Sequence, residues 1–169
     1  GNQIQRMLAV PGMESAVSAM EFLRTSNMKR ESLAGKRVVI LGGGGVAFDC
    51  AFTARRLGAA SVSLVFPESA DNIRTTADEI RQAHDEGIIM YPSHLTTSLS
   101  EGNVHARRLS SFTFDEKGEL IAEFEDDDIH DIPGDIVICA SGLKPDIDFL
   151  DGLNPKRTPR GHLAVNDDM

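Results

Sequence analysis

The stretch RVVILGGGGVAFDC, Arg37 to Cys50, places four glycines directly after a run of branched apolar residues. The run Arg37–Leu41 is typical of a short strand buried in a parallel sheet. After the glycines, small apolar residues recur at helical spacing from Val46 to Leu57, and Gly58 is a natural stop. Ordered glycine costs backbone entropy, so this run indicates either a flexible loop or a backbone that something approaches closely.

A glycine loop between a strand and a helix matches the dinucleotide fingerprint G-x-G-x-x-G/A. Gly42 would permit the tight turn, Gly44 would let a pyrophosphate approach the main chain, and Ala47 would let the helix pack closely. Gly43 falls on a variable position. The helix N-terminus adds free N–H groups and a partial positive charge. A Walker A loop is excluded because no Gly-Lys-Ser/Thr follows, whereas a turn without a ligand stays an alternative. The predicted pyrophosphate site is Gly42, Gly44, Gly45, Val46 and Ala47.

The end of the second predicted strand, Ser61–Phe66, bears on the choice between NAD and NADP, because it follows the loop by about 20 residues. Glu68, the second residue after this strand, can accept hydrogen bonds from the ribose 2′-OH and would repel a 2′-phosphate, which favours NAD. Glu68 as a solvated loop charge is the alternative, and Arg74 could contact a 2′-phosphate, so NADP stays less favoured. We expect Phe66, Pro67 and Glu68 to line the adenosine site, with Arg74 at its edge.

The remaining segments predict an α/β fold. Thr76 and Glu79 form a capping-box pattern that opens a helix ending at Gly87, and Ile88–Tyr91 is a third short strand. A meander of antiparallel strands is then predicted at His94–Leu99, Val104–Phe114 and Glu119–Glu125. Asp135–Ala140 is another buried run. Alternating strands and helices indicate a parallel sheet with right-handed crossovers. We therefore expect a Rossmann-like three-layer domain, in which a parallel sheet is joined to an antiparallel β-meander.

Composition excludes several classes of function. The formal net charge is -9 and basic residues are scattered, which argues against nucleic acid as a partner. No run of about 18 apolar residues is present, so we expect no membrane span. Cys50 and Cys139 lie in apolar sequence without CxxC spacing, and we expect buried free thiols in a reducing compartment, the cytoplasm.

Other polar residues receive no chemical role. Asp49 is expected in the first turn of the glycine-loop helix, where a carboxylate suits the helix dipole. The run Glu125–Asp128 lacks the ligand spacing of a calcium loop and is interpreted as a solvated turn between strands. The histidines show no metal-ligand spacing, so we expect no metal site and no catalytic residue. These histidines are His84, His94, His105, His130 and His162.

Four segments in this order resemble one known family. They are Gly35–Phe66, the DNIR motif at Asp71–Arg74, Thr75–Gly87 and Asp135–Leu150. Together they resemble the NAD(P)-binding domain of the glutamate synthase small subunit and dihydropyrimidine dehydrogenase-like family of FAD-dependent pyridine nucleotide oxidoreductases. The likeness extends from about Pro11 to Met169.

The resemblance implies two interleaved Rossmann-like domains, of which one binds FAD and the other, an insertion, binds NADPH or NADH. Hydride would pass from nicotinamide to flavin, and iron–sulfur clusters or a partner subunit would take the electrons onward. It implies that Pro11–Leu23, whose spacing predicts a helix from Met13 to Leu23, links into the insertion. Ala140, Ser141 and Gly142 would form the turn back toward the FAD domain, near the nicotinamide.

We therefore divide the chain into a linker with a helix at 1–34, an NAD(P)-binding domain at 35–142, and at 143–169 the start of the return to an FAD domain that this sequence does not contain. The chain alone would then be inactive. Thr25–Gly35 is predicted as a polar connection.

The chain departs from the family at two places, and the first bears on the cofactor. NADPH-using members commonly carry a basic pair where this chain has Pro67 and Glu68, which favours NAD, although Arg74 keeps the arginine of the NIR loop. Gly45 stands where relatives often have Asp or Asn. The alternative function is a nucleotide-sensing or structural Rossmann module. A third reading, an S-adenosylmethionine-dependent methyltransferase, is disfavoured by the meander and the Ala-Ser-Gly turn.

Overall fold

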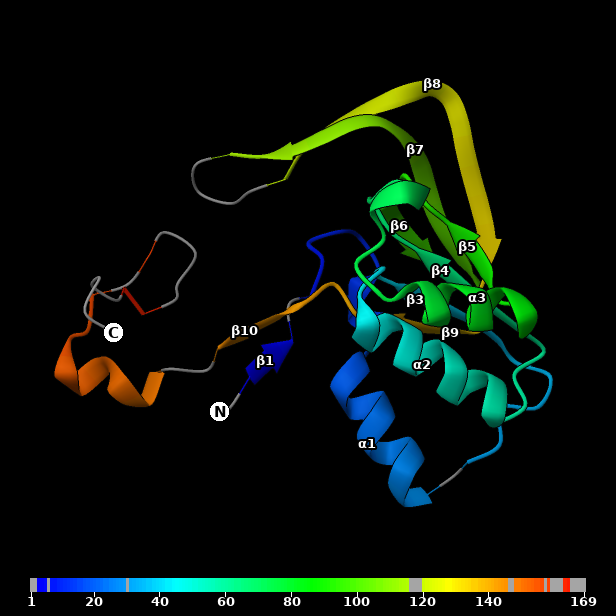
Figure 1. The fold of residues 1–169 in the computed structure, drawn as a ribbon, viewed down its shortest axis with the longest axis horizontal. Coiled ribbons are helices and arrows are strands. Elements are labelled where there is room, and N and C mark those ends of the chain that lie inside the picture. Colours follow the sequence, from blue (N-terminus) through cyan, green and yellow to red (C-terminus); the bar gives the residue numbers. More distant parts are fainter. Residues whose placement is uncertain are drawn as a thin grey trace.

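The computed structural model describes residues 3–5, 7–29, 31–115, 120–145, 148–156, 158 and 163–164. Within these ranges, a five-stranded parallel sheet has the strand order β2-β9-β3-β4-β5. This order places β3, the strand before the glycine loop, at the centre of the sheet (Figure 1). The strands are β2 (Val17–Ser18), β3 (Arg37–Leu41), β4 (Ser61–Val65), β5 (Ile89–Tyr91) and β9 (Ile136–Cys139).

Three helices cover one face of the sheet: α1 (Ala19–Lys29), α2 (Gly45–Arg56) and α3 (Ala77–Asp85). Because side chains alternate across a strand, β3 contributes to two cores. Its Val38 and Ile40 pack with the helices, whereas Val39 and Leu41 pack on the opposite face.

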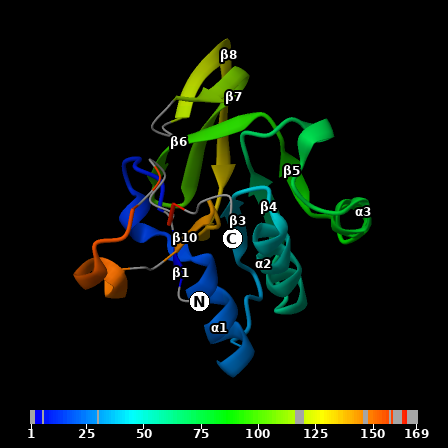
Figure 2. The same ribbon diagram turned by 60° about the vertical axis from the view of Figure 1, so that its left-hand side comes forward.

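The opposite face is covered by an antiparallel meander of β6 (His94–Ser100), β7 (Asn103–Phe114) and β8 (Leu120–Pro133). Leu99, Val104, Ala106 and Ile132 from these strands are buried against the sheet. Figure 2 shows the meander above the sheet and α1 and α2 below it. The expected Rossmann-like three-layer fold with a parallel sheet and a meander is confirmed.

The segment before the glycine loop corrects two predictions. A 3-10 turn, η1 (Met13–Ser15), and strand β2 replace the first part of the helix predicted over Met13–Leu23. Helix α1 begins only at Ala19 and continues to Lys29, through residues predicted as a connection. The reason is tertiary: β2 pairs with β9 at the sheet edge, and this pairing outweighs the helical spacing of the apolar residues.

The acidic run Glu125–Asp128 is not a turn between strands, as predicted, but part of β8. The register jumps there, because Leu109 faces Phe124 whereas Arg107 faces Ile129. The acidic run therefore bulges opposite Arg108, whose Nε lies 3.3 Å from Glu125 Oε2 and whose Nη1 lies 3.7 Å from Asp128 Oδ2. The charge of the run is thus partly neutralised by one arginine.

Strands β1 (Gln3–Gln5) and β10 (Leu143–Pro145) form a separate antiparallel pair beside the main domain, followed by η3 (Asp148–Leu153) (Figure 1). The chain segments at the two ends of the domain, β1 and β10, are therefore paired with each other. Helix α1 shares the core of α2. The domain limits at 34 and 142 stay predictions, and His162 lies outside the described residues. No helix in the described part of the chain combines the length and apolar character needed to cross a membrane.

Candidate functional site

The first half of the glycine loop is required by the packing of the protein itself. Gly42 has φ +145°, its N–H donates to Val65 O at 2.8 Å, and a Cβ there would lie 2.5 Å from Ala140 O. A Cβ on Gly43 would lie 2.7 Å from Cγ of the Phe66 ring. Gly43 was expected at a variable position of the fingerprint, but here a larger residue would force the Phe66 ring or the loop to shift.

The second half of the loop is open. A Cβ on Gly44 or Gly45 would have no atom within 4 Å. Gly44 is the N-cap of α2 and has φ -91°, and no side chain caps the N–H groups of the first turn. This is the cradle that a pyrophosphate fits, since helix N-termini favour anions and small residues let them approach.

Asp49 is exposed and lies beyond the first turn of α2, which contains no acidic residue. Its prediction as a first-turn carboxylate is wrong, because the helix begins at Gly45 and not at Val46. The correction favours anion binding, since no carboxylate in that turn repels a phosphate. Val46 is partly buried and Ala47 is fully buried in the core between α2 and the sheet.

Phe66 was expected to line the adenosine site, and its side chain does not do so. The ring is fully buried in the helix-side core and lies under Gly43. Phe66 therefore supports the glycine loop from below. Its backbone N–H donates to Tyr91 O at 3.2 Å, and its carbonyl accepts from His94 N–H at 2.9 Å.

Glu68 and Arg74, the residues that point to different cofactors, lie together. Arg74 Nε is 3.5 Å from Glu68 Oε1, and the side chains are 71% and 18% exposed. The backbone of Arg74 also forms a parallel bridge with Gly44, so the NIR loop is attached to the glycine loop. Glu68 therefore presents a carboxylate near the loop with its charge partly compensated by Arg74.

A cavity of about 530 Å³ opens beside this ion pair. Pro67 contributes to its wall, and the outer part of β7 forms the opposite side. The polar lining includes Glu68, Asn72, Arg74, Ser93, Ser110 and Ser111. The cavity adjoins Arg74, whose backbone bridges with Gly44, and its serine hydroxyls and the Asn72 amide suit a ribose and a base.

The Ala-Ser-Gly turn lies on the other side of the glycine loop. It follows β9, the neighbour of β3, and Ala140 N–H donates to Leu41 O at 2.8 Å. Ser141 Oγ is 3.3 Å from Cys139 Sγ, and Gly142 has φ +107°. The carboxyl ends of β3 and β9 thus bring the predicted nicotinamide end beside Gly42, where ligands of open α/β sheets bind.

Cys50 and Cys139 are both buried free thiols, as expected. Burial, with a smaller contribution from Asp49, raises the pKa of the Cys50 thiol to about 12. Cys50 lies in the core between α2 and α1, where its Sγ is 4.0 Å from Ala19 O. A thiol with this pKa is inert, so Cys50 is not a redox centre.

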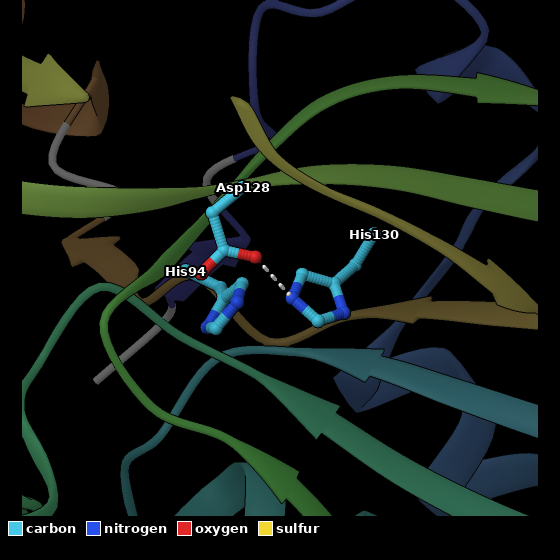
Figure 3. Close-up of side chains that lie close together, drawn as sticks. All are labelled: His94, Asp128 and His130. Carbon is cyan, nitrogen blue, oxygen red and sulfur yellow. Dashed lines mark hydrogen bonds and ion pairs between the residues drawn. The ribbon is translucent and has the colours of Figure 1, made fainter. Parts of the chain in front are cut away.

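The fold also brings together His94, Asp128 and His130, as Figure 3 shows. One potential ligand atom from each lies within 4.8 Å of the others. Sequence spacing did not reveal this group, because His94 begins β6 and the other two residues lie in β8. The only local signal was the alternation that places Asp128 and His130 on one side of a strand.

The sequence also matches a known protein family. The sequence model of the family described as "Pyridine nucleotide-disulphide oxidoreductase" matches residues 3–169. The chain belongs to this family. The expected resemblance to glutamate synthase small subunits is confirmed, while its dihydropyrimidine dehydrogenase part stays a prediction.

Two curated relatives of this oxidoreductase domain illustrate the likeness. The NADP(+)-dependent formate dehydrogenase subunit beta of Moorella thermoacetica is 35% identical over 147 residues, which cover 83% of this chain and 21% of that protein. The glutamate synthase [NADPH] small chain of Escherichia coli is 33% identical over 132 residues, which cover 75% of this chain and 28% of the relative. The chain therefore spans less than a third of either protein.

Solved structures of oxidoreductases share the fold of this chain. Thioredoxin reductase from T. acidophilum superposes with a TM-score of 0.71 at 17% identity, covering 98% of this chain and 50% of that one. Lactococcus lactis thioredoxin reductase gives a TM-score of 0.70. At this identity the likeness concerns the fold alone.

Proposed function

We propose that this chain is the nicotinamide-dinucleotide-binding domain of a larger FAD-dependent oxidoreductase. The observation that carries the proposal is the open cradle at Gly44 and Gly45, which meets an uncapped helix N-terminus. A purely structural module would have no need to keep this space clear. Family membership and the names of the relatives support a role in pyridine nucleotide oxidation.

Each part of the site has a task in this proposal. Gly42, Gly44, Gly45, Val46 and Ala47 hold the pyrophosphate through main-chain N–H groups and the dipole of α2. Pro67 and Glu68 position the adenine ribose in the adjoining cavity, and Ala140, Ser141 and Gly142 lie at the nicotinamide end. When bound, the dinucleotide would supply hydride for the flavin of the parent protein, and iron–sulfur clusters or a partner subunit would take the electrons onward.

This domain supplies no acid or base, because hydride transfer to a flavin needs none from it. The chain holds no FAD site in the proposal, so it binds the dinucleotide without completing the reaction. Free buried thiols and the scarcity of clustered basic residues suit a cytoplasmic protein without nucleic acid or membrane partners.

For the dinucleotide itself we favour NAD over NADP. Glu68 is only 18% exposed and faces the cavity, where its carboxylate suits a ribose 2′-OH and opposes a 2′-phosphate. Arg74 Nε lies 3.5 Å from Glu68 Oε1, so this carboxylate offsets part of the positive charge that a 2′-phosphate would meet. The NADPH in the names of the relatives belongs to those proteins, and only binding measurements on this chain decide.

Calorimetric titration of the chain with NADH and with NADPH tests both the proposed dinucleotide binding and the preference for NAD. Wild type should bind NADH with the smaller Kd. Glu68→Arg should move the ratio of the two Kd values toward NADPH by about tenfold or more, which corresponds to about 1.4 kcal/mol. Failure to bind either dinucleotide up to millimolar concentration would remove the proposed function.

Glu101→Arg is the matched control for charge. Glu101 is exposed in the turn between β6 and β7, at the far end of β6 from Glu68, a separation of about 20 Å along the strand. Glu101→Arg changes the net charge by the same amount as Glu68→Arg. Because Glu101 is far from the cavity, this substitution should leave the ratio of the two Kd values unaltered. Equal shifts in the two variants would mean that Glu68 does not contact the ribose.

A further inference from the structure

His94 carries a buried nitrogen without a partner. The residue is only 6% exposed, and its Nδ1 lies 2.7 Å from Pro92 O. Because a carbonyl oxygen only accepts, Nδ1 carries the proton, and Nε2 of the neutral ring has a lone pair. Among the described residues no hydrogen-bond partner reaches this Nε2. A buried polar atom left in this state is costly and calls for a ligand.

Two further potential metal ligands from β8 lie close to His94: Asp128 in the bulge and His130 just after it. His130 Nε2 is 2.8 Å from Asp128 Oδ1, and the rings of His94 and His130 meet edge to face with centroids 4.7 Å apart (Figure 3). Tyr91 contacts both rings and forms one wall of the group. The side chains of Asp128 and His130 are 34% and 38% exposed, so an ion could enter from solvent.

We propose that His94, Asp128 and His130 form a binding site for a divalent transition metal of the zinc type. Two imidazoles and one carboxylate are ligands that Zn²⁺, Co²⁺ and Ni²⁺ favour over Mg²⁺ or Ca²⁺. Metal–nitrogen bonds of about 2.0–2.1 Å place tetrahedral ligands about 3.3 Å apart. The ligand atoms lie within 4.8 Å, so small side-chain rotations complete the site.

The contacts already present suit this assignment. The Pro92 carbonyl fixes the tautomer and orientation of His94, as outer partners of metal-bound histidines do. Asp128 faces Arg108 with Oδ2 and His130 with Oδ1, so the arginine leaves Oδ1 for the metal. The bound ion takes the place of the proton between Asp128 and His130. Three protein ligands leave one position for water.

The site would connect the meander to the loop that carries Glu68. His94 N–H donates to Phe66 O, and Ser93 N–H donates to Glu68 O at 2.8 Å. An ion bound by His94 and the β8 residues would therefore join β8 to the backbone beside the dinucleotide cavity.

The test is a titration of the chelator-treated, tag-free chain with Co²⁺, followed by competition with Zn²⁺. The proposal expects one Co²⁺ per chain, visible d–d absorption of tetrahedral intensity, and its loss on adding Zn²⁺. Saturating Zn²⁺ should raise Tm by about 5 °C or more. An absence of binding up to millimolar Co²⁺ overturns the proposal and leaves water as the partner of His94.

Variants separate this site from other histidines. His130→Ala and Asp128→Asn should each weaken Co²⁺ binding at least about tenfold. His105→Ala is the matched control, because His105 Nδ1 lies 2.5 Å from Asp131 Oδ1 in the same meander, while its Nε2 is already bonded to Ser100. Binding that survives in His130→Ala, or that falls equally in His105→Ala, contradicts the assignment. His130 is partly exposed, so its loss leaves a folded protein.

Discussion

Replacing Gly43 by alanine should destabilise the fold, although Gly43 lies in a loop beside solvent-facing glycines. The added Cβ would lie 2.7, 2.9 and 3.0 Å from Cγ, Cδ2 and Cβ of Phe66. That ring is fully buried and packed on all sides, so it cannot rotate away. Overpacking of this kind costs about 1–3 kcal/mol, which a gain of about 0.4–1 kcal/mol from the stiffer unfolded chain partly offsets.

The net loss of about 1–2 kcal/mol corresponds to a fall in Tm of about 2–8 °C for a chain of this size. Urea unfolding followed by circular dichroism measures it. Gly45→Ala is the control, because its Cβ meets nothing within 4 Å and lies in a helix, so stability should stay equal or rise by up to about 1 kcal/mol. A Gly43→Ala protein as stable as wild type would refute the claim that Phe66 fixes the loop.

Two further predictions concern ionisable groups. Arg37 donates two side-chain hydrogen bonds and one backbone hydrogen bond to Asp135, which hold the pKa of that carboxyl well below its usual range. The resulting stability is complete above about pH 5 and is lost as pH falls further. Asp135→Asn should therefore lower Tm at neutral pH and flatten its decline between about pH 5 and pH 2. Because the pKa of Cys50 is raised to about 12, this thiol should react with a disulfide reagent at neutral pH only after unfolding, as peptide mapping would show.

The glycine loop was predictable because its signals are local. A β-branched run, a tight turn and a helix of small residues are all contained within Arg37–Leu57, and β3 and α2 form nearly as expected. The capping box at Thr76 and Glu79 is also present. Alternation of strands and helices was enough to predict the parallel sheet, and consecutive strands joined by tight turns predicted the meander.

What the sequence missed depends on contacts between distant segments. Strand β2 exists because Val17 pairs with Ile138, and Gly43 is constrained because the Phe66 ring lies beneath it. The Glu125–Asp128 run lies in a strand, where Arg108 is within ion-pair distance of Glu125 and Asp128. The grouping of His94 with Asp128 and His130 requires the meander to fold over the sheet. None of these contacts has a signature within one segment.

The most direct test of the central claim is the affinity of Gly44→Ala for NADH, measured by calorimetry beside wild type. A Cβ at Gly44 meets no protein atom within 4 Å, so the fold and its Tm should be unchanged. The methyl group would occupy the space reserved for the pyrophosphate, and NADH binding should weaken at least about tenfold. Equal NADH affinity in the two proteins would contradict the assignment of this loop as the dinucleotide site.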